Sequence, residues 1–235
     1  MIARIGLLLI CACFSLPSFA DSLICFGDSQ TAIRVPLVQS DTFCSKMAIA
    51  TGKTDINKGI GGNTSTDGIN RLTNDVLAQQ GSCVTVMFGA NDAFIDNTAT
   101  YDYQSYWTAP KPSAVPVTQY MSNLNSMIQQ IKAAGKQVTL ITPWAFWSTA
   151  QLNQMPFYVD AMKAVSMQTG TPLLDAYGIQ LNRWWSSQPW LAPSTNAPSM
   201  WLQEQDYQHP SGYGHTEIAD LCKKPQSANA CACKA

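Results

Sequence analysis

The sequence predicts an α/β fold, a three-layer α/β/α sandwich with a central parallel sheet. Short apolar runs, which are typical of buried strands, alternate along the chain with longer stretches of helical periodicity. Strands separated by helices favour a parallel sheet that is covered on both faces. Because neither an internal repeat nor a linker divides the chain, we expect one domain over residues 21–235, ending in a cysteine-containing tail at 222–235.

Five strands and five helices are expected. The strands are apolar runs or short segments bounded by Gly, Pro or Asp, at 23–26, 55–57, 83–88, 137–141 and 172–175. The helices carry apolar residues at spacings of three and four, at 41–51, 64–80, 117–134, 152–169 and 212–221. Two long stretches rich in aromatic residues, 93–116 and 182–205, are expected to be irregular.

Residues 1–20 have the layout of a secretory signal peptide. Arg4 precedes an apolar run at 5–14, and small residues lead to Ala20. The run is shorter than the about 20 residues that a membrane-spanning helix needs. A retained anchor and a lipoprotein processing site within 10–13 are the alternatives. We therefore expect cleavage near Ala20 and a secreted or periplasmic protein without a stable membrane span.

Charge and cysteine content indicate which partners and metals the protein is not expected to bind. The formal net charge is −1 and no basic stretch occurs, which argues against nucleic acid as a partner. An even number of cysteines after cleavage favours disulfides in an exported protein but leaves their connectivity open: Cys25, Cys44, Cys83, Cys222, Cys231 and Cys233. A bond from Cys222 to Cys231 or Cys233 would tie down the tail, whereas Cys25, in an apolar run, is interpreted as a buried thiol. Since no second ligand pair at zinc spacing accompanies Cys231 and Cys233, neither a metal nor a cofactor is expected.

Three of the predicted strands are followed by small, polar segments, which lie at 27–29, 59–63 and 89–92. A fourth predicted strand, at 137–141, is followed by Pro143-Trp144. Ligand sites of open parallel sheets lie at these carboxyl ends of the strands. The chemistry is therefore expected at this edge of the sheet.

The chain has two histidines, and they differ in their neighbours. Asp206 precedes His209 by three residues, so a turn would let the carboxylate orient the imidazole and leave its other nitrogen to act as a base. Such a base is what a serine hydroxyl needs to become a nucleophile. His215 has no carboxylate at that spacing and lies inside the last predicted helix, so it is expected to be structural or to lie at the rim of the site.

Four blocks of the sequence resemble the GDSL, or SGNH, hydrolase family. Residues 26–31 resemble its first block and 57–64 its second, 88–92 match its Gly-x-Asn-Asp block, and 206–210 match its Asp-x-x-His block. The blocks occur in the family's order from residue 26 to about 219. The resemblance implies an SGNH-hydrolase (flavodoxin-like) fold and the hydrolysis of carboxylic esters. A Gly-x-Ser-x-Gly elbow is absent from the sequence, which argues against the α/β-hydrolase fold.

The resemblance also implies a role for each matching residue. Ser29 would be the nucleophile, His209 the general base and Asp206 its orienting partner. The oxyanion would be held by the backbone N–H groups of Ser29 and Gly62 and by the side-chain amide of Asn91. The chain departs from the family at Gln30, where an apolar residue is usual, and at Asn63, where an acidic residue is common.

The substrate is inferred from the aromatic residues of the two long stretches and of the strand ends. Trp107, Trp144 and Trp201 are expected to contact substrate, and stacking on a sugar would suit short acyl (acetyl) esters on glycans. The alternative is an apolar groove for a fatty acyl chain, as in a lipase or lysophospholipase. In another functional class, the protein would be a catalytically inactive carbohydrate-binding protein. A metal-dependent hydrolase finds little support in two histidines without a carboxylate cluster.

Overall fold

The computed structural model describes residues 21–93, 115–144, 154–187 and 209–235. Its centre is a parallel sheet with the strand order β2-β1-β3-β4-β5. The strands are β1 (Ser22–Gly27), β2 (Thr54–Gly59), β3 (Cys83–Met87), β4 (Gln137–Ile141) and β5 (Leu173–Leu174). The expected three-layer α/β/α architecture is confirmed, and each expected strand is present.

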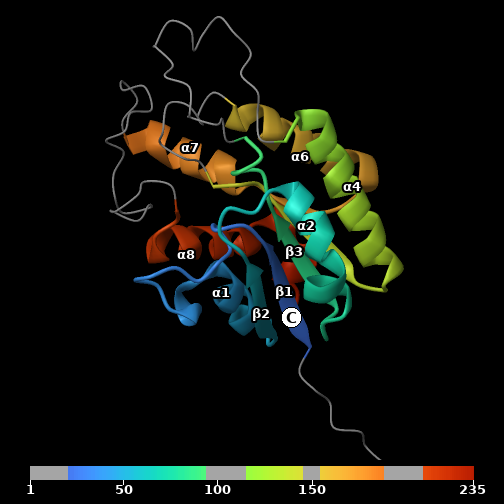
Figure 1. Ribbon diagram of the computed structural model, residues 1–235. Helices are drawn as coiled ribbons and strands as arrows, with labels where there is room; N and C mark the ends of the chain where they lie inside the picture. Colours follow the sequence, from blue (N-terminus) through green and yellow to red (C-terminus); the bar gives the residue numbers. More distant parts are fainter. Residues whose placement is uncertain (1–20, 94–114, 145–153, 188–208) are drawn as a thin grey trace, which may run out of the picture.

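Helices cover both faces of the sheet (Figure 1). One face carries α1 (Phe43–Ala50), α8 (Gly212–Asp220) and three short 3₁₀ helices at Leu221–Lys223, Pro225–Ser227 and Cys231–Cys233. The other face carries α2 (Ser65–Leu72), which continues into a π-helical turn at Thr73–Leu77, and α4 (Val117–Ala133) and α6 (Met155–Thr169). A 3₁₀ turn at Gln39–Asp41 precedes α1. Within the described residues, none of the helices has the length and apolar character needed to cross a bilayer.

One helix was not expected. The stretch 182–205 was predicted to be irregular, but α7 (Ala176–Ser187) extends into it. The carboxylate of Asp175 accepts a hydrogen bond of 2.9 Å from the backbone N–H of Gly178, so the chain turns into a helix directly after β5. The sequence pattern gave no sign of this helix because Gly178 and Asn182 interrupt its apolar periodicity.

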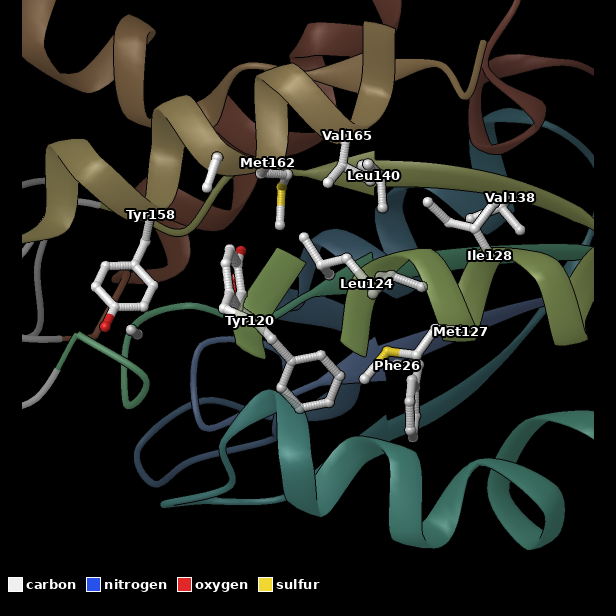
Figure 2. Packing of buried hydrophobic residues seen from close by; sticks show 14 of the residues in the cluster. Phe26, Tyr120, Leu124, Met127, Ile128, Val138, Leu140, Tyr158, Met162 and Val165 are labelled. Atoms are coloured by element: carbon white, nitrogen blue, oxygen red, sulfur yellow. The ribbon is translucent and has the colours of Figure 1, made fainter. Parts of the chain in front are cut away.

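The central strands β1 and β3 are buried on both faces, so their alternate side chains enter two separate cores. From β1, Ile24 and Phe26 pack beneath α2, α4 and α6, whereas Leu23 and Cys25 pack beneath α1 and α8. Figure 2 shows the first core, which β1, β4, α4 and α6 build from large apolar side chains: Phe26, Tyr120, Leu124, Met127, Ile128, Val138, Leu140, Tyr158, Met162 and Val165.

Three disulfides join distant parts of the second core. Cys25 bonds Cys44, Cys83 bonds Cys231, and Cys222 bonds Cys233. The interpretation of Cys25 as a buried thiol is wrong, because its side chain faces α1 and meets Cys44 there. The expected bond from Cys222 to the tail is confirmed with Cys233 as its partner. The Cys83–Cys231 bond attaches the tail to the middle of the sheet.

Candidate active site

The strand order reverses between β1 and β3, because the chain places β2 at one edge of β1 and then returns to place β3 at the other. In parallel α/β sheets, ligands bind at such a switch point beyond the carboxyl ends of the strands. The segments that follow β1, β2 and β3 in this chain are the three that carry Ser29, Gly62 and Asn91. The fold therefore brings three of the predicted site residues to one place.

A tight turn places Ser29 directly after β1. The backbone N–H groups of Thr31 and Ala32 both donate to the carbonyl of Asp28, at 3.2 and 3.1 Å. Gly27 permits this turn, because a Cβ there would lie 2.2 Å from Thr31 Oγ1 and 2.4 Å from the carbonyl oxygen of Met87. The chain can therefore turn away from the sheet at once, which carries Ser29 beyond the end of β1.

His209 lies against Ser29 although 180 residues separate them. Its Nε2 is 2.7 Å from Ser29 Oγ, which is hydrogen-bond distance. Both side chains are largely buried, Ser29 at 8% and His209 at 7% exposure. His209 precedes α8, whose first turn is capped by the Ser211 hydroxyl. The predicted partner Asp206 lies outside the described residues.

The segment after β2 forms a turn beside Ser29. Asn63 N–H donates to the carbonyl of Ile60, and Gly62 has φ +80°, as the third residue of a type II turn requires. A Cβ on Gly61 would lie 3.8 Å from the Cβ of Ser29, so the turn passes close to the serine. Asn91, after β3, donates from its side-chain amide to the carbonyl of Asn63 at 2.9 Å. The segments that follow β2 and β3 are thus joined at the site.

Two polar residues that the sequence did not single out hold these segments in place. The Arg71 guanidinium donates to the carbonyls of Gly27 and Lys58 at the ends of β1 and β2, at 2.7 and 2.9 Å. It also pairs with Asp75 at 2.7 Å and lies 4.3 Å above the Phe26 ring. Asn57 donates to the carbonyl of Thr31 at 2.8 Å and so attaches β2 to the serine turn.

The only sequence signal for Arg71 is its spacing of four from Asp75 on a predicted helix, which is typical of any surface ion pair. Asn57 stands in the second family block but was given no role. Both residues act on backbone carbonyls, and a sequence pattern carries no information about which carbonyl lies nearby.

Two buried carboxylates lie beneath the site. Burial raises the pKa of Asp28 to about 7; the charge of Asp92 adds to the rise, while the Gln30 N–H and the Arg71 charge oppose it. Burial also raises the pKa of Asp92 to about 6, against the hydrogen bonds from Ser65. Asp92 accepts from the Ser65 backbone and hydroxyl, which anchors the start of α2 to the segment after β3. Both carboxylates are therefore internal supports of the loops.

His215 is a buried structural residue, in agreement with its place in the last predicted helix. Its Nδ1 accepts a hydrogen bond of 3.2 Å from the backbone N–H of Phe43, and its ring stacks on the Phe43 ring with centroids 5.8 Å apart. Burial lowers the pKa of His215 to about 3. Since Nδ1 accepts, the neutral ring carries its proton on Nε2.

The three tryptophans predicted to contact substrate have different outcomes. Trp144 is 1% exposed and packs in the core beneath α1 and α8 with Ile141 and Leu174, so the expectation that its ring faces substrate is wrong. Trp107 and Trp201 lie outside the described residues. Among the residues that the structure describes, no three His, Cys, Asp or Glu side chains are grouped to hold a metal ion.

Comparison with curated proteins finds an esterase that is similar to part of this chain. An acetylxylan esterase from Geobacillus stearothermophilus is 29% identical over 123 residues, which cover 51% of this chain and 52% of that protein. The match therefore spans about half the length of this curated relative.

Solved structures resemble most of the chain. A lipase/acylhydrolase from Enterococcus faecalis has a TM-score of 0.64 at 24% identity, covering 86% of this chain and 92% of its own. A lipolytic protein of the G-D-S-L family from Desulfitobacterium hafniense has a TM-score of 0.63 at 16% identity, covering 85% and 96%. A catalytic mutant of the Geobacillus stearothermophilus acetylxylan esterase Axe2 has a TM-score of 0.61 at 23% identity, covering 86% and 91%. At these identities the likeness establishes the fold.

The sequence itself establishes the family. The sequence model of the GDSL-like lipase/acylhydrolase family matches residues 25–216, from the middle of β1 into α8. With the sheet, the switch point and the Ser29–His209 pair in place, the chain belongs to the GDSL-like lipase/acylhydrolase family, a family of carboxylic ester hydrolases.

Proposed function

We propose that this protein is a serine esterase that hydrolyses carboxylic esters through an acyl-enzyme on Ser29. The observation that carries the proposal is the 2.7 Å distance between Ser29 Oγ and His209 Nε2. A serine hydroxyl is a weak nucleophile until an adjacent base accepts its proton, and a base must lie within hydrogen-bond reach to do so. This pair meets that requirement.

The proposed reaction has two halves. In the first, Ser29 Oγ attacks the ester carbonyl carbon as His209 Nε2 takes the hydroxyl proton. His209 then gives that proton to the alkoxy oxygen, so the C–O bond breaks, the alcohol leaves and the acyl group remains on Ser29. In the second half, His209 takes a proton from water, the water oxygen attacks the acyl carbon, and His209 returns the proton to Ser29 as the carboxylic acid leaves. Asp206, three residues before His209, is proposed to orient the imidazole.

The negative charge on the carbonyl oxygen needs donors. We assign the backbone N–H groups of Ser29 and Gly62 and the side-chain amide of Asn91 to this role. An amide carries two N–H groups, and the bond to Asn63 uses one of them, which orients the other. Gly62 lies on an exposed turn beside Ser29, and a glycine there keeps the approach to its N–H open. Each such donor contributes about 3–4 kcal/mol to stabilisation of the transition state.

The proposed substrates are short acyl esters, acetyl esters above all, carried on a glycan. The curated relative named an acetylxylan esterase supports this choice, as does the family to which the chain belongs. A second candidate, hydrolysis of fatty acyl esters, is favoured by exposed apolar side chains near the site. Ile60, beside the Gly61 turn, is 45% exposed, and Ile33, four residues after Ser29, is 47% exposed.

We also propose that the protein is exported and that residues 1–20 are removed. The three disulfides of the described residues support this, because such bonds persist in oxidising compartments. Sequencing the N-terminus of the protein from the producing cell tests the proposal. A mature chain starting at Asp21 is expected, and a chain that retains Met1 would contradict it.

The test of the activity compares p-nitrophenyl esters from acetate to palmitate on the wild-type protein and on Ser29→Ala. Loss of turnover with Ser29→Ala supports the proposal, and the dependence on chain length separates acetyl from fatty acyl esters. Ser166→Ala is the matched control, since that hydroxyl bonds the carbonyl of Thr171 at the opposite end of the sheet. Full turnover by Ser29→Ala would contradict Ser29 as the nucleophile. No turnover by the wild type on p-nitrophenyl esters and acetylated xylan alike would contradict an esterase and favour a binding protein.

A further inference from the structure

The side chain of Gln30, the residue after Ser29, makes two hydrogen bonds that no family motif implies. Its Nε2 donates to the carbonyl of Trp144 at 2.9 Å, and its Oε1 accepts from the Trp144 backbone N–H at 2.8 Å. Gln30 is fully buried, and the two residues are 114 positions apart. The amide thus bonds both backbone polar groups of a single distant residue.

The position of Trp144 explains why such a partner is useful. The strand β4 ends at Ile141, and the last sheet-like bond beyond it runs from Thr142 N–H to the carbonyl of Leu174. Trp144 itself is buried past this point. A buried backbone group left without a partner costs about 1–3 kcal/mol. Gln30 supplies one donor and one acceptor, which an apolar residue at this position could not do.

The same two bonds restrain the serine turn. On one side of Ser29, the N–H of Asp28 donates to the carbonyl of Met87 at 3.3 Å, which attaches the turn to β3. On the other side, Gln30 attaches it to the chain leaving β4. Ser29 therefore lies between two anchored residues, and the direction of its Oγ depends on both.

We propose that Gln30 is a positioning residue that holds Ser29 Oγ within hydrogen-bond distance of His209 Nε2 by fixing the serine turn to the backbone of Trp144. This inference rests on the proposed role of Ser29 as nucleophile. Gln30 does not touch the reacting atoms in this scheme, and its effect passes through the backbone of the turn.

Replacement by a side chain of similar length without hydrogen-bonding atoms, Gln30→Met, tests the inference. A displacement of about 1 Å can cost about 100-fold in rate, so kcat on p-nitrophenyl acetate is expected to fall about 10- to 100-fold. KM should stay within about 2-fold, since the change alters the nucleophile and leaves the binding surface in place. The rate at which a phosphonate ester inactivates the enzyme should fall in the same proportion, because that reaction reports Ser29 directly.

Ser166→Ala is the control, because it also removes a hydrogen bond to a backbone carbonyl but at the opposite end of the sheet. It is expected to lower the melting temperature without changing kcat or the inactivation rate. If Gln30→Met lowers the melting temperature and leaves both rates at the wild-type value, Gln30 is merely structural and the inference is wrong. Should Gln30→Met not fold, Gln30→Leu takes its place, and failure of both to fold also overturns the positioning role. Retained activity in Ser29→Ala, by contrast, would overturn the proposed function itself.

Discussion

The side-chain amide of Asn91 donates a 2.9 Å hydrogen bond to the carbonyl of Asn63, which joins the segment after β3 to the turn after β2. The bond sets the plane of the amide. Its second N–H can then be directed at a fixed point beside Ser29, as a preorganised donor must be. The proposed oxyanion site therefore depends on a contact between two segments that lie 28 residues apart.

Replacing Asn91 with alanine should lower kcat by about 10²–10³-fold, because one oxyanion donor is lost. The free energy of unfolding should fall by only about 1 kcal/mol, the usual contribution of one hydrogen bond. Steady-state kinetics and thermal unfolding of the same preparation measure both. Asn125→Ala is the matched control, since its amide donates to the carbonyl of Met121 on α4, and its kcat should be unchanged. An unfolded Asn91→Ala variant, or one with full turnover, would remove Asn91 from the oxyanion site.

Gly59→Ala should disturb the site through packing alone. A Cβ on Gly59 would lie 2.2 Å from the backbone nitrogen of Ala32, in the turn that carries Ser29. Overpacking of this kind costs about 1–3 kcal/mol, and here the displaced atoms belong to the serine turn, so both stability and kcat should fall. Gly52→Ala is the comparison. At φ +67° an alanine there is strained, but its Cβ meets nothing within 4 Å, so this variant should keep wild-type kcat. Equal kcat values for the two variants would show that the Gly59 contact does not position Ser29.

The Cys83–Cys231 disulfide should stabilise the protein more than Cys222–Cys233 does. The two bonds close loops with sequence separations of 148 and 11 residues. Chain entropy then gives about 5 and about 3 kcal/mol respectively. Denaturant unfolding of the two paired alanine variants measures the difference. A greater loss from removing Cys222–Cys233 would show that native-state contacts of the tail, rather than loop length, govern its contribution.

Acid should destabilise the protein through His215. Burial lowers the pKa of His215 from 6.5 to about 3, so the folded state binds fewer protons than the unfolded state between these values. The contribution to stability is complete above about pH 6.5 and is lost as the pH falls towards 3, by up to about 5 kcal/mol. His215→Asn keeps an acceptor for the Phe43 N–H and removes the titration, so its unfolding free energy should fall less steeply over this range. Parallel pH profiles for the two proteins would contradict this account.

Much of the fold could be predicted from local patterns. Both faces of β1 are buried, with Ile24 and Phe26 on one side and Leu23 and Cys25 on the other, which makes the strand apolar throughout and so easy to recognise. Helical spacing similarly identified α4 to within one residue at its end. The helix α7 was missed in part because its start depends on the cap from Asp175, which competes with the strand pattern before it.

The candidate site divides in the same way. The order and spacing of four short blocks identified Ser29 and His209, and the structure brings their side chains to 2.7 Å. The sequence did not reveal that Arg71 binds the carbonyls at the ends of two strands or that Gln30 binds Trp144. To predict these contacts, one must know which backbone groups of another segment lie nearby. That is known only once the strands and helices have been placed relative to one another.

By itself, then, the sequence determined the strands, most of the helices, the family and the residues expected to carry the chemistry, since these depend on residue type and short spacing. The tertiary structure decided the pairing of Cys25 with Cys44, the burial of the Trp144 ring and the bond between Asn91 and Asn63. These depend on which distant segments become neighbours when the sheet assembles in the order β2-β1-β3-β4-β5. A side chain that could bond several partners bonds a particular one only when packing brings that partner within reach and burial excludes water as the alternative.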